Sequence, residues 1–200
     1  MKGEFFEKIR AELEEKEKVR EELIIKSREL RISSSKAIAN IHAGRMDESA
    51  LHLGEAERAL REILEYRKSH PDVFYLANDA LQEFIEAVVF RHVVERLEIP
   101  ESLPVNIPQA VLPGMADCIG EIRRYVLTEM IRGRDFERVE RLLDLMEEIY
   151  RTLIQFDFHD RLTGNLRPKL DVARNVIERT KSDLIAARIY WKLRSEKDSG

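Results

Sequence analysis

The chain has 200 residues, of which 44% are hydrophobic and 36% charged, and these proportions suffice for a domain with a substantial core. Its formal net charge of −4 excludes a surface that attracts nucleic acid through a strongly basic overall field, so any such site has to be local. Its single cysteine, Cys118, excludes an intramolecular disulfide and a cysteine zinc cluster, and it favours a reducing compartment.

Membrane segments are not indicated anywhere in the sequence. The first residues, MKGEFFEKIRAELEEKEK, lack the apolar core of a signal peptide. No apolar run approaches the roughly 18 residues that a membrane-spanning helix needs. We therefore expect a cytoplasmic protein that makes no membrane contact.

Helical periodicity dominates the sequence and strand patterns are nearly absent, so we predict an all-α fold of six to seven antiparallel helices in a bundle. The first predicted helix covers 3–42 and ends before Gly44, and the second covers Asp47–Tyr66. A third begins at Pro71, because proline suits the first turn of a helix, and it runs to about Glu98.

Prolines mark the main predicted loop, since four of the six lie within Ile99–Pro113. A shorter turn is expected at Asp160–Asn165. Residues 1–200 are expected to form a single domain, in which the polar tail 193–200 frays. The three helices predicted after the main loop cover Gly114–Ile131, Phe136–Phe156 and Leu166 to about Arg194.

Acidic residues stand in two helices that the pattern predicts to face protein. The segment FIEAVVFRHVV, residues 84–94, is apolar around most of its circumference, yet Glu83 and Glu86 lie on this helix. Asp117 and Glu121 lie one turn apart on the next helix. Inward carboxylates are costly unless they are paired or bind a cation, so these four acids predict a metal site. Oxygen ligands favour Mg²⁺ or Mn²⁺ over zinc.

An alternative needs no metal, because Glu83 and Glu86 could pair with arginines across a helical interface. The spacing of the acids does not decide between the two interpretations. A di-iron bundle requires a histidine three residues after a glutamate, and neither Glu83 nor Glu86 has one. Cys118 is expected to pack in the core rather than act as a nucleophile. The arginines available for pairing are Arg91, Arg123 and Arg124.

Four segments, in order along most of the chain, resemble translin and translin-associated factor X. The most specific likeness is Q-E-x-x-E-A followed by A-D-x-x-G-E. The segments are EELIIKSRELRISSSKAIANIH (21–42), LQEFIEAVVFRHVVE (81–95), LPGMADCIGEIRRYV (112–126) and LRPKLDVARNVIERTKSDLIAA (166–187).

The resemblance implies a fold of seven helices per subunit and a hollow homo-oligomeric shell, expected to be an octamer. Seven helices would require the first predicted helix to consist of two pieces. The long insertion that the eukaryotic associated factor carries has no counterpart in the loop 99–113. The identity of the partner subunits therefore stays open.

The resemblance also implies a function. The associated factor is the family's nuclease, and its acidic ligands match Glu83, Glu86, Asp117 and Glu121, so the chain is similar to the catalytic subunit. We expect a metal-dependent endoribonuclease that uses Mg²⁺ or Mn²⁺ on single-stranded RNA. The alternative is a non-catalytic scaffold that binds single-stranded RNA or DNA, and a purely structural bundle is a third possibility. By the same resemblance, the residues expected to bind RNA are Arg28, Lys36 and Arg124.

Overall fold

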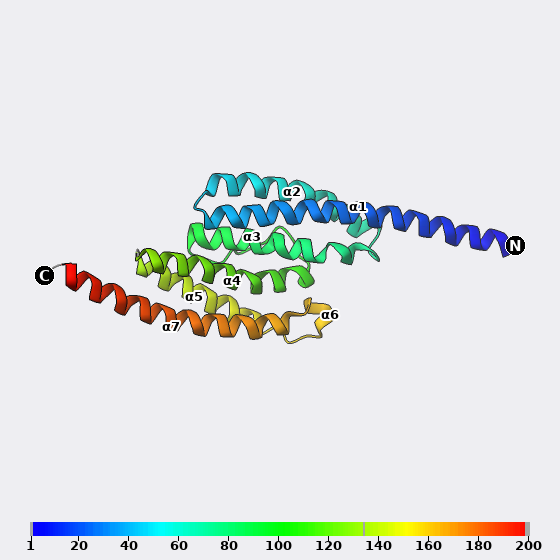
Figure 1. The fold of residues 1–200 in the computed structure, drawn as a ribbon. Helices are drawn as coiled ribbons and strands as arrows, with labels where there is room; N and C mark the ends of the chain where they lie inside the picture. Colours follow the sequence, from blue (N-terminus) through cyan, green and yellow to red (C-terminus); the bar gives the residue numbers. More distant parts are fainter. Residues whose placement is uncertain (1, 134, 199–200) are drawn as a thin grey trace. The chain divides into compact units, whose positions relative to one another are not determined.

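A computed structural model describes residues 2–133 and 135–198, which divide into two compact units with the boundary between Phe84 and Ile85. Seven α-helices and no strand occur within these described residues, so the all-α prediction is confirmed (Figure 1). None of these helices is long and apolar enough to cross a membrane.

The first unit is built on a helical hairpin. Helix α1 (Lys2–His42) and helix α2 (Met46–Ser69) lie side by side, joined through Gly44, which has a φ of +73° (Figure 1). Positive φ is a conformation that glycine adopts without steric cost. Buried aliphatic residues at helical spacing, including Leu23 and Leu30 on α1 and Ile63 on α2, form the core of the hairpin. The predicted break at Gly44 is therefore confirmed.

The third predicted helix begins later than expected. Pro71 lies in a turn, and a short 3₁₀ helix, η1 (Phe74–Ala77), precedes helix α3 (Asn78–Arg96). The Val73 amide donates to the His70 carbonyl and the Leu76 amide to the Val73 carbonyl, each at 3.2 Å. In both bonds the donor lies three residues after the acceptor, as in a tight turn. The start predicted from Pro71 is therefore about two helical turns too early.

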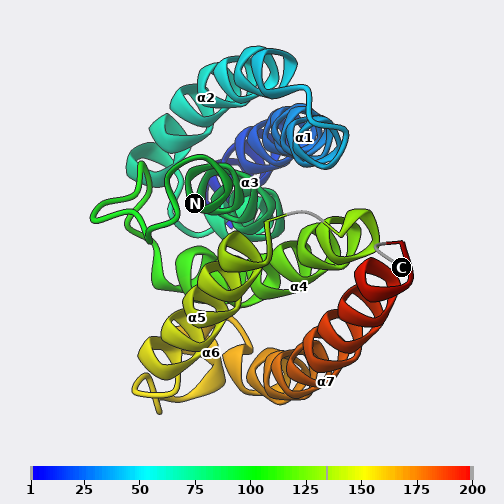
Figure 2. The ribbon, with the colours of Figure 1, turned by 90° about the vertical axis from the view of Figure 1, so that its left-hand side faces the viewer.

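The second unit contains the rest of α3 and helices α4 (Pro108–Arg132), α5 (Phe136–Leu153), α6 (Asp160–Thr163) and α7 (Leu166–Asp198). Helix α4 packs against α5, α6 and α7 (Figure 2). The short α6 occupies the predicted turn and supplies the seventh helix. The expectation that the first predicted helix consists of two pieces is therefore wrong, because α1 is continuous over 41 residues.

Helix α4 begins at Pro108 rather than at Gly114, and it contains Pro113 as a buried residue. Proline at the first turn removes no hydrogen bond, but Pro113 leaves the Gln109 carbonyl without its usual amide donor four residues on. Gly164, which closes α6 with a φ of +66°, lies against this carbonyl and the Pro113 ring. The loop predicted for 99–113 therefore ends where α4 begins, at Pro108.

The ends of the last two helices also differ from the prediction. Helix α5 ends at Leu153 rather than Phe156, whereas α7 continues to Asp198. Residues 193–198 of the predicted frayed tail are therefore helical, and residues 199–200 lie outside the described residues. On α7, the Trp191 indole donates a 2.9 Å hydrogen bond to the Met130 carbonyl at the end of α4.

Gly164→Ala is expected to lower the free energy of unfolding by about 1 to 3 kcal/mol, because the new Cβ would overlap the Gln109 carbonyl and the backbone would be strained. Gly54→Ala is the matched control. Gly54 lies within α2 with open space around its missing Cβ, so alanine there should raise stability by about 0.5 to 1 kcal/mol. Urea denaturation measures both. A Gly164→Ala variant as stable as the unaltered chain would contradict this account of the α4–α6 contact.

Candidate active site

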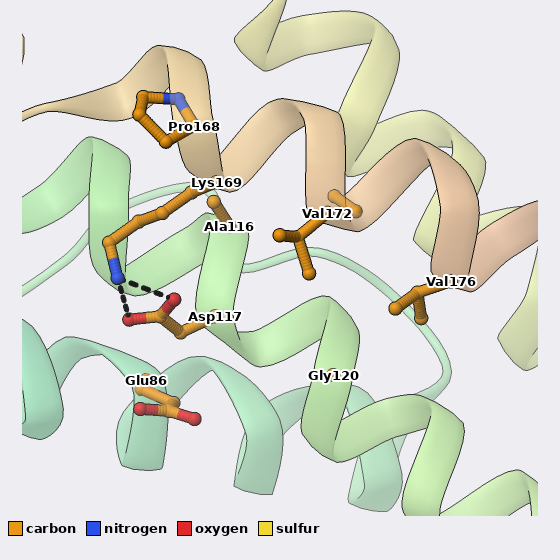
Figure 3. A pocket seen from close by; sticks show the side chains of 9 residues that line it. Glu86, Ala116, Asp117, Gly120, Pro168, Lys169, Val172 and Val176 are labelled. Atoms are coloured by element: carbon orange, nitrogen blue, oxygen red, sulfur yellow. Dashed lines mark hydrogen bonds and ion pairs between the residues drawn. The ribbon is translucent and has the colours of Figure 1, made fainter.

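A pocket of about 450 Å³ in the second unit brings together α3, α4 and α7. Figure 3 shows the Glu86 and Asp117 carboxylates on α3 and α4, with the Lys169 ammonium group reaching Asp117 from α7. The charged groups therefore gather at one side of the pocket, and aliphatic side chains form much of the rest. The lining residues are Glu86, Ala116, Asp117, Gly120, Pro168, Lys169, Val172, Ala173 and Val176.

Lys169 holds both oxygens of Asp117. Its Nζ lies 2.7 Å from Oδ1 and 2.7 Å from Oδ2, and the two side chains are 30% and 27% exposed. Charge-assisted hydrogen bonds of this length are among the stronger polar contacts in proteins. The ion pair also connects the first turns of α7 to the middle of α4.

Three carboxylates lie within electrostatic range of the buried thiol of Cys118. Burial raises the pKa of this thiol well above its ordinary value, because a thiolate is poorly solvated in the core. Nearby negative charges raise the pKa further, which shows that several acids lie within electrostatic range of one sulfur atom. These acids are Glu86, Glu121 and Asp117.

Glu83 lies one turn before Glu86 on α3, but it belongs to the first unit. Its Oε1 accepts a hydrogen bond of 2.5 Å from the Ser35 hydroxyl on α1. The structure thus brings together Glu86, Asp117 and Glu121 in one unit and gives Glu83 a defined partner in the other.

The arginines of the alternative interpretation have other carboxylate partners. Arg91 donates to Glu95 at 2.7 Å and Arg123 to Asp183 at 2.8 Å. Arg124 is the exception, because its guanidinium lies 3.7 Å from Glu121, one turn away on the same helix. The Arg124 guanidinium therefore compensates part of the negative charge of the Glu121 carboxylate.

The donor set suits a hard divalent cation, because it consists of carboxylate oxygens from neighbouring helices at a partly exposed pocket. As the side chains stand, however, no three His, Cys, Asp or Glu residues in the described part of the chain are gathered closely enough to hold a metal ion. Asp117 faces Lys169 in this arrangement. The carboxylate oxygens are thus suitable ligands for a cation. To bind one, Asp117 would have to give up at least one of its two contacts with Lys169.

Comparison with known proteins decides the family. No family model matches the chain. An uncharacterized protein of Methanocaldococcus jannaschii is 31% identical over 185 residues, which is 91% of this chain and 82% of the relative. The crystal structure of AfC3PO, a protein of the translin type, is 48% identical, with a TM-score of 0.85 over 92% of this chain and 97% of that one. The chain belongs to the translin family.

Two further solved structures resemble this translin-family chain. A complex of AfC3PO with duplex RNA is 46% identical, with a TM-score of 0.85 over 92% of this chain and 97% of that chain. The structure of apo-NeC3PO is 23% identical, with a TM-score of 0.81 over 91% of this chain and 96% of that one, and it supports the fold alone. The expected translin-like fold is thus confirmed.

The three residues expected to bind RNA are all exposed. Arg28 and Lys36 lie on α1 in the first unit, whereas Arg124 lies on α4 in the second. Exposed cationic side chains are free to reach phosphate oxygens. Their exposure is compatible with the predicted role and leaves that role a prediction.

Sequence reasoning missed Lys169, although a signal was present. The buried stripe of α7 recurs every three or four residues through Leu166, Ala173, Ile177 and Thr180, and Lys169 occupies a position in that series. A lysine in an inward stripe requires a negative partner, because an isolated buried ammonium group is costly. The stripe thus implied an acid opposite Lys169, but not which acid.

Cys118 should resist alkylation in the native protein. Its side chain is 0% exposed, so iodoacetamide cannot reach the sulfur until the core opens. Mass spectrometry should detect at most trace labelling over hours in buffer and complete labelling within minutes in denaturant. Rapid labelling of the folded protein would show that the core around Cys118 opens readily, contrary to the complete burial of this side chain.

Proposed function

We propose that this chain is a metal-dependent endoribonuclease of the translin-associated factor X type, which hydrolyses phosphodiester bonds in single-stranded RNA. The observation that carries the proposal is the meeting of Glu86 and Asp117 at one pocket, with Glu121 one turn beyond Asp117. Confining negative charge beside a phosphate ligand is unfavourable for a protein that only binds RNA. It is useful when the acids bind a cation.

The proposed ligands are Glu83, Glu86, Asp117 and Glu121, with Glu83 assigned by resemblance. A bound Mg²⁺ or Mn²⁺ would polarise a phosphodiester oxygen and lower the pKa of a water molecule. One of the glutamates would then accept a proton from the attacking water as general base. The Ser35 hydroxyl, which donates to Glu83, would hold that carboxylate in one orientation.

RNA binding in an acidic chain requires local positive charge, and we assign it to Arg28, Lys36 and Arg124. A net charge of −4 does not oppose this, because screening restricts each phosphate contact to roughly 10 Å. The related AfC3PO has been solved in complex with duplex RNA, which supports RNA as the ligand class. Assays on this chain should therefore include single-stranded and duplex RNA.

A non-catalytic RNA-binding scaffold is the second candidate. The ion pair between Lys169 and Asp117 favours it, because a carboxylate held at both oxygens needs no metal. The two candidates differ in what happens to bound RNA. A scaffold would lose RNA affinity as the salt concentration rises but would leave the RNA intact in Mg²⁺, whereas the nuclease would cleave it.

Glu86→Gln and Glu83→Gln should abolish Mg²⁺-dependent RNA cleavage, by at least a hundredfold, because each removes a charged ligand and keeps the side-chain shape. Glu95→Gln is the matched control. Glu95 also lies on α3, where it binds Arg91, and the variant should cleave normally. Labelled single-stranded RNA with Mg²⁺ or with chelator provides the assay.

Folding must be checked alongside cleavage, with melting temperatures in chelator. We expect the Glu86→Gln variant to melt at or above the temperature of the unaltered chain, because fewer acids repel one another. A large drop in melting temperature combined with undiminished cleavage would show that this acid is structural and that the active site lies elsewhere.

We further propose that the chain assembles into a homo-oligomer, expected to be an octamer, through the outer face of α7. The large apolar residues toward the end of this helix include Leu184, Ile185, Ile189 and Trp191. Leu184 is buried within its own chain and the Trp191 indole binds Met130, so these two stabilise the subunit instead. Ile185 and Ile189 remain exposed, at 63% and 56%, one turn apart.

Replacing Ile185 and Ile189 together by Asp should reduce the mass observed by analytical ultracentrifugation, because a charged pair cannot be buried in an apolar interface. The control places two aspartates at Asn175 and Ser182, which are exposed and polar on the same helix, and should leave the mass unchanged. If the isoleucine variant keeps the mass of the unaltered chain, this face of α7 is not the interface.

A further inference from the structure

Lys169 occupies the position in the pocket where a cation would compensate Asp117. Its ammonium group lies 2.7 Å from each Asp117 oxygen, at a pocket that Glu86 also lines. Glu121 lies one turn away from Asp117 on α4. Lys169 therefore provides positive charge to a pocket at which the Glu86 and Asp117 carboxylates meet.

We propose that Lys169 is a tethered competitor of the divalent cation, which positions Asp117 in the absence of the ion and thereby sets the affinity of the site for it. The inference rests on the proposed function, because it takes Asp117 as a ligand of the metal. It assigns to Lys169 a positioning role that acts through Asp117.

The geometry of the Asp117 carboxylate sets up this competition. Both Asp117 oxygens face one ammonium group, so a divalent cation reaching them meets a positive charge already in place. Two like charges a few ångströms apart repel, and the aliphatic wall of Val172, Ala173 and Val176 reduces the screening by water. Lys169 must therefore move away or lose one of its contacts when the metal binds.

The lysine side chain is suited to such an exchange. Its ammonium group is a compact charge on a flexible four-carbon stem, and 30% of the side chain is exposed. Lys169 also lies in the first turn of α7, directly after Pro168, so its stem can swing toward solvent without moving the rest of the helix. An arginine would hold the carboxylate through a rigid, bidentate contact and would exchange less readily.

A purely structural role for the ion pair between Lys169 and Asp117 predicts a different outcome. If Lys169 only fastens α7 to α4, its removal should destabilise the subunit and leave metal affinity unchanged. If it competes with the metal, its removal should destabilise the protein in chelator, raise metal affinity, and increase the thermal stabilisation that the metal provides.

The test is calorimetric titration of the purified full-length chain with Mn²⁺, comparing the unaltered protein with Lys169→Met, which keeps the stem and removes the charge. We expect at least tenfold tighter binding, equivalent to about 1.4 kcal/mol. Lys181→Met is the matched control, because it removes the same charge from α7 at a residue that pairs with Glu147 and Glu178. Its affinity should stay within twofold.

Lys169→Arg completes the design, since it keeps the charge and should bind Mn²⁺ no more tightly than the unaltered chain. It also covers the case in which Lys169→Met does not fold, because tighter binding by the arginine variant would overturn the inference. If the unaltered chain binds Mn²⁺ and Lys169→Met binds no more tightly, the inference fails and the proposed nuclease stands. If no variant binds the metal, the proposed metal dependence fails as well.

Discussion

Ionised carboxylates directed toward other helices require compensating positive charge, and this requirement organises the second unit. Taking a charged group out of water costs several kcal/mol unless a counter-charge or strong hydrogen bonds replace the hydration. Here the counter-charges are Lys169 for Asp117 and, more distantly, Arg124 for Glu121. The contact between α4 and α7 is thus fixed by charge as well as by apolar packing, and the pocket opens where the charges meet.

The sequence predicted the helical class and most helix positions because apolar periodicity reports directly on which face of a helix is buried. It failed where proline was used as a boundary marker. Pro71 suggested a helix start and lies in a turn, whereas Pro113 suggested a loop and lies inside α4. Proline restricts its own backbone and removes one donor, but whether a helix tolerates that loss depends on the surrounding packing.

The candidate site was predictable in part. Carboxylates on apolar helices are visible in a sequence, so Glu86, Asp117 and Glu121 could be singled out, and the structure places all three near Cys118. The partner of Asp117, Lys169, lies 52 residues further along the chain, and this pairing depends on how α7 packs against α4. Only tertiary structure determines that register. The assignment of these residues to metal binding stays a prediction.

The contact of Gly164 with the Gln109 carbonyl has a consequence for how the family can vary. Pro113 removes the donor that would normally hold this carbonyl within α4, and the glycine leaves the oxygen the space it needs. The residues at 113 and 164 therefore form one steric unit, although α5 and the segment after it separate them in the chain. Replacing proline at the first position would relieve only the steric overlap, because the φ of +66° at the second still favours glycine, so relatives are expected to keep glycine at position 164 even where position 113 varies.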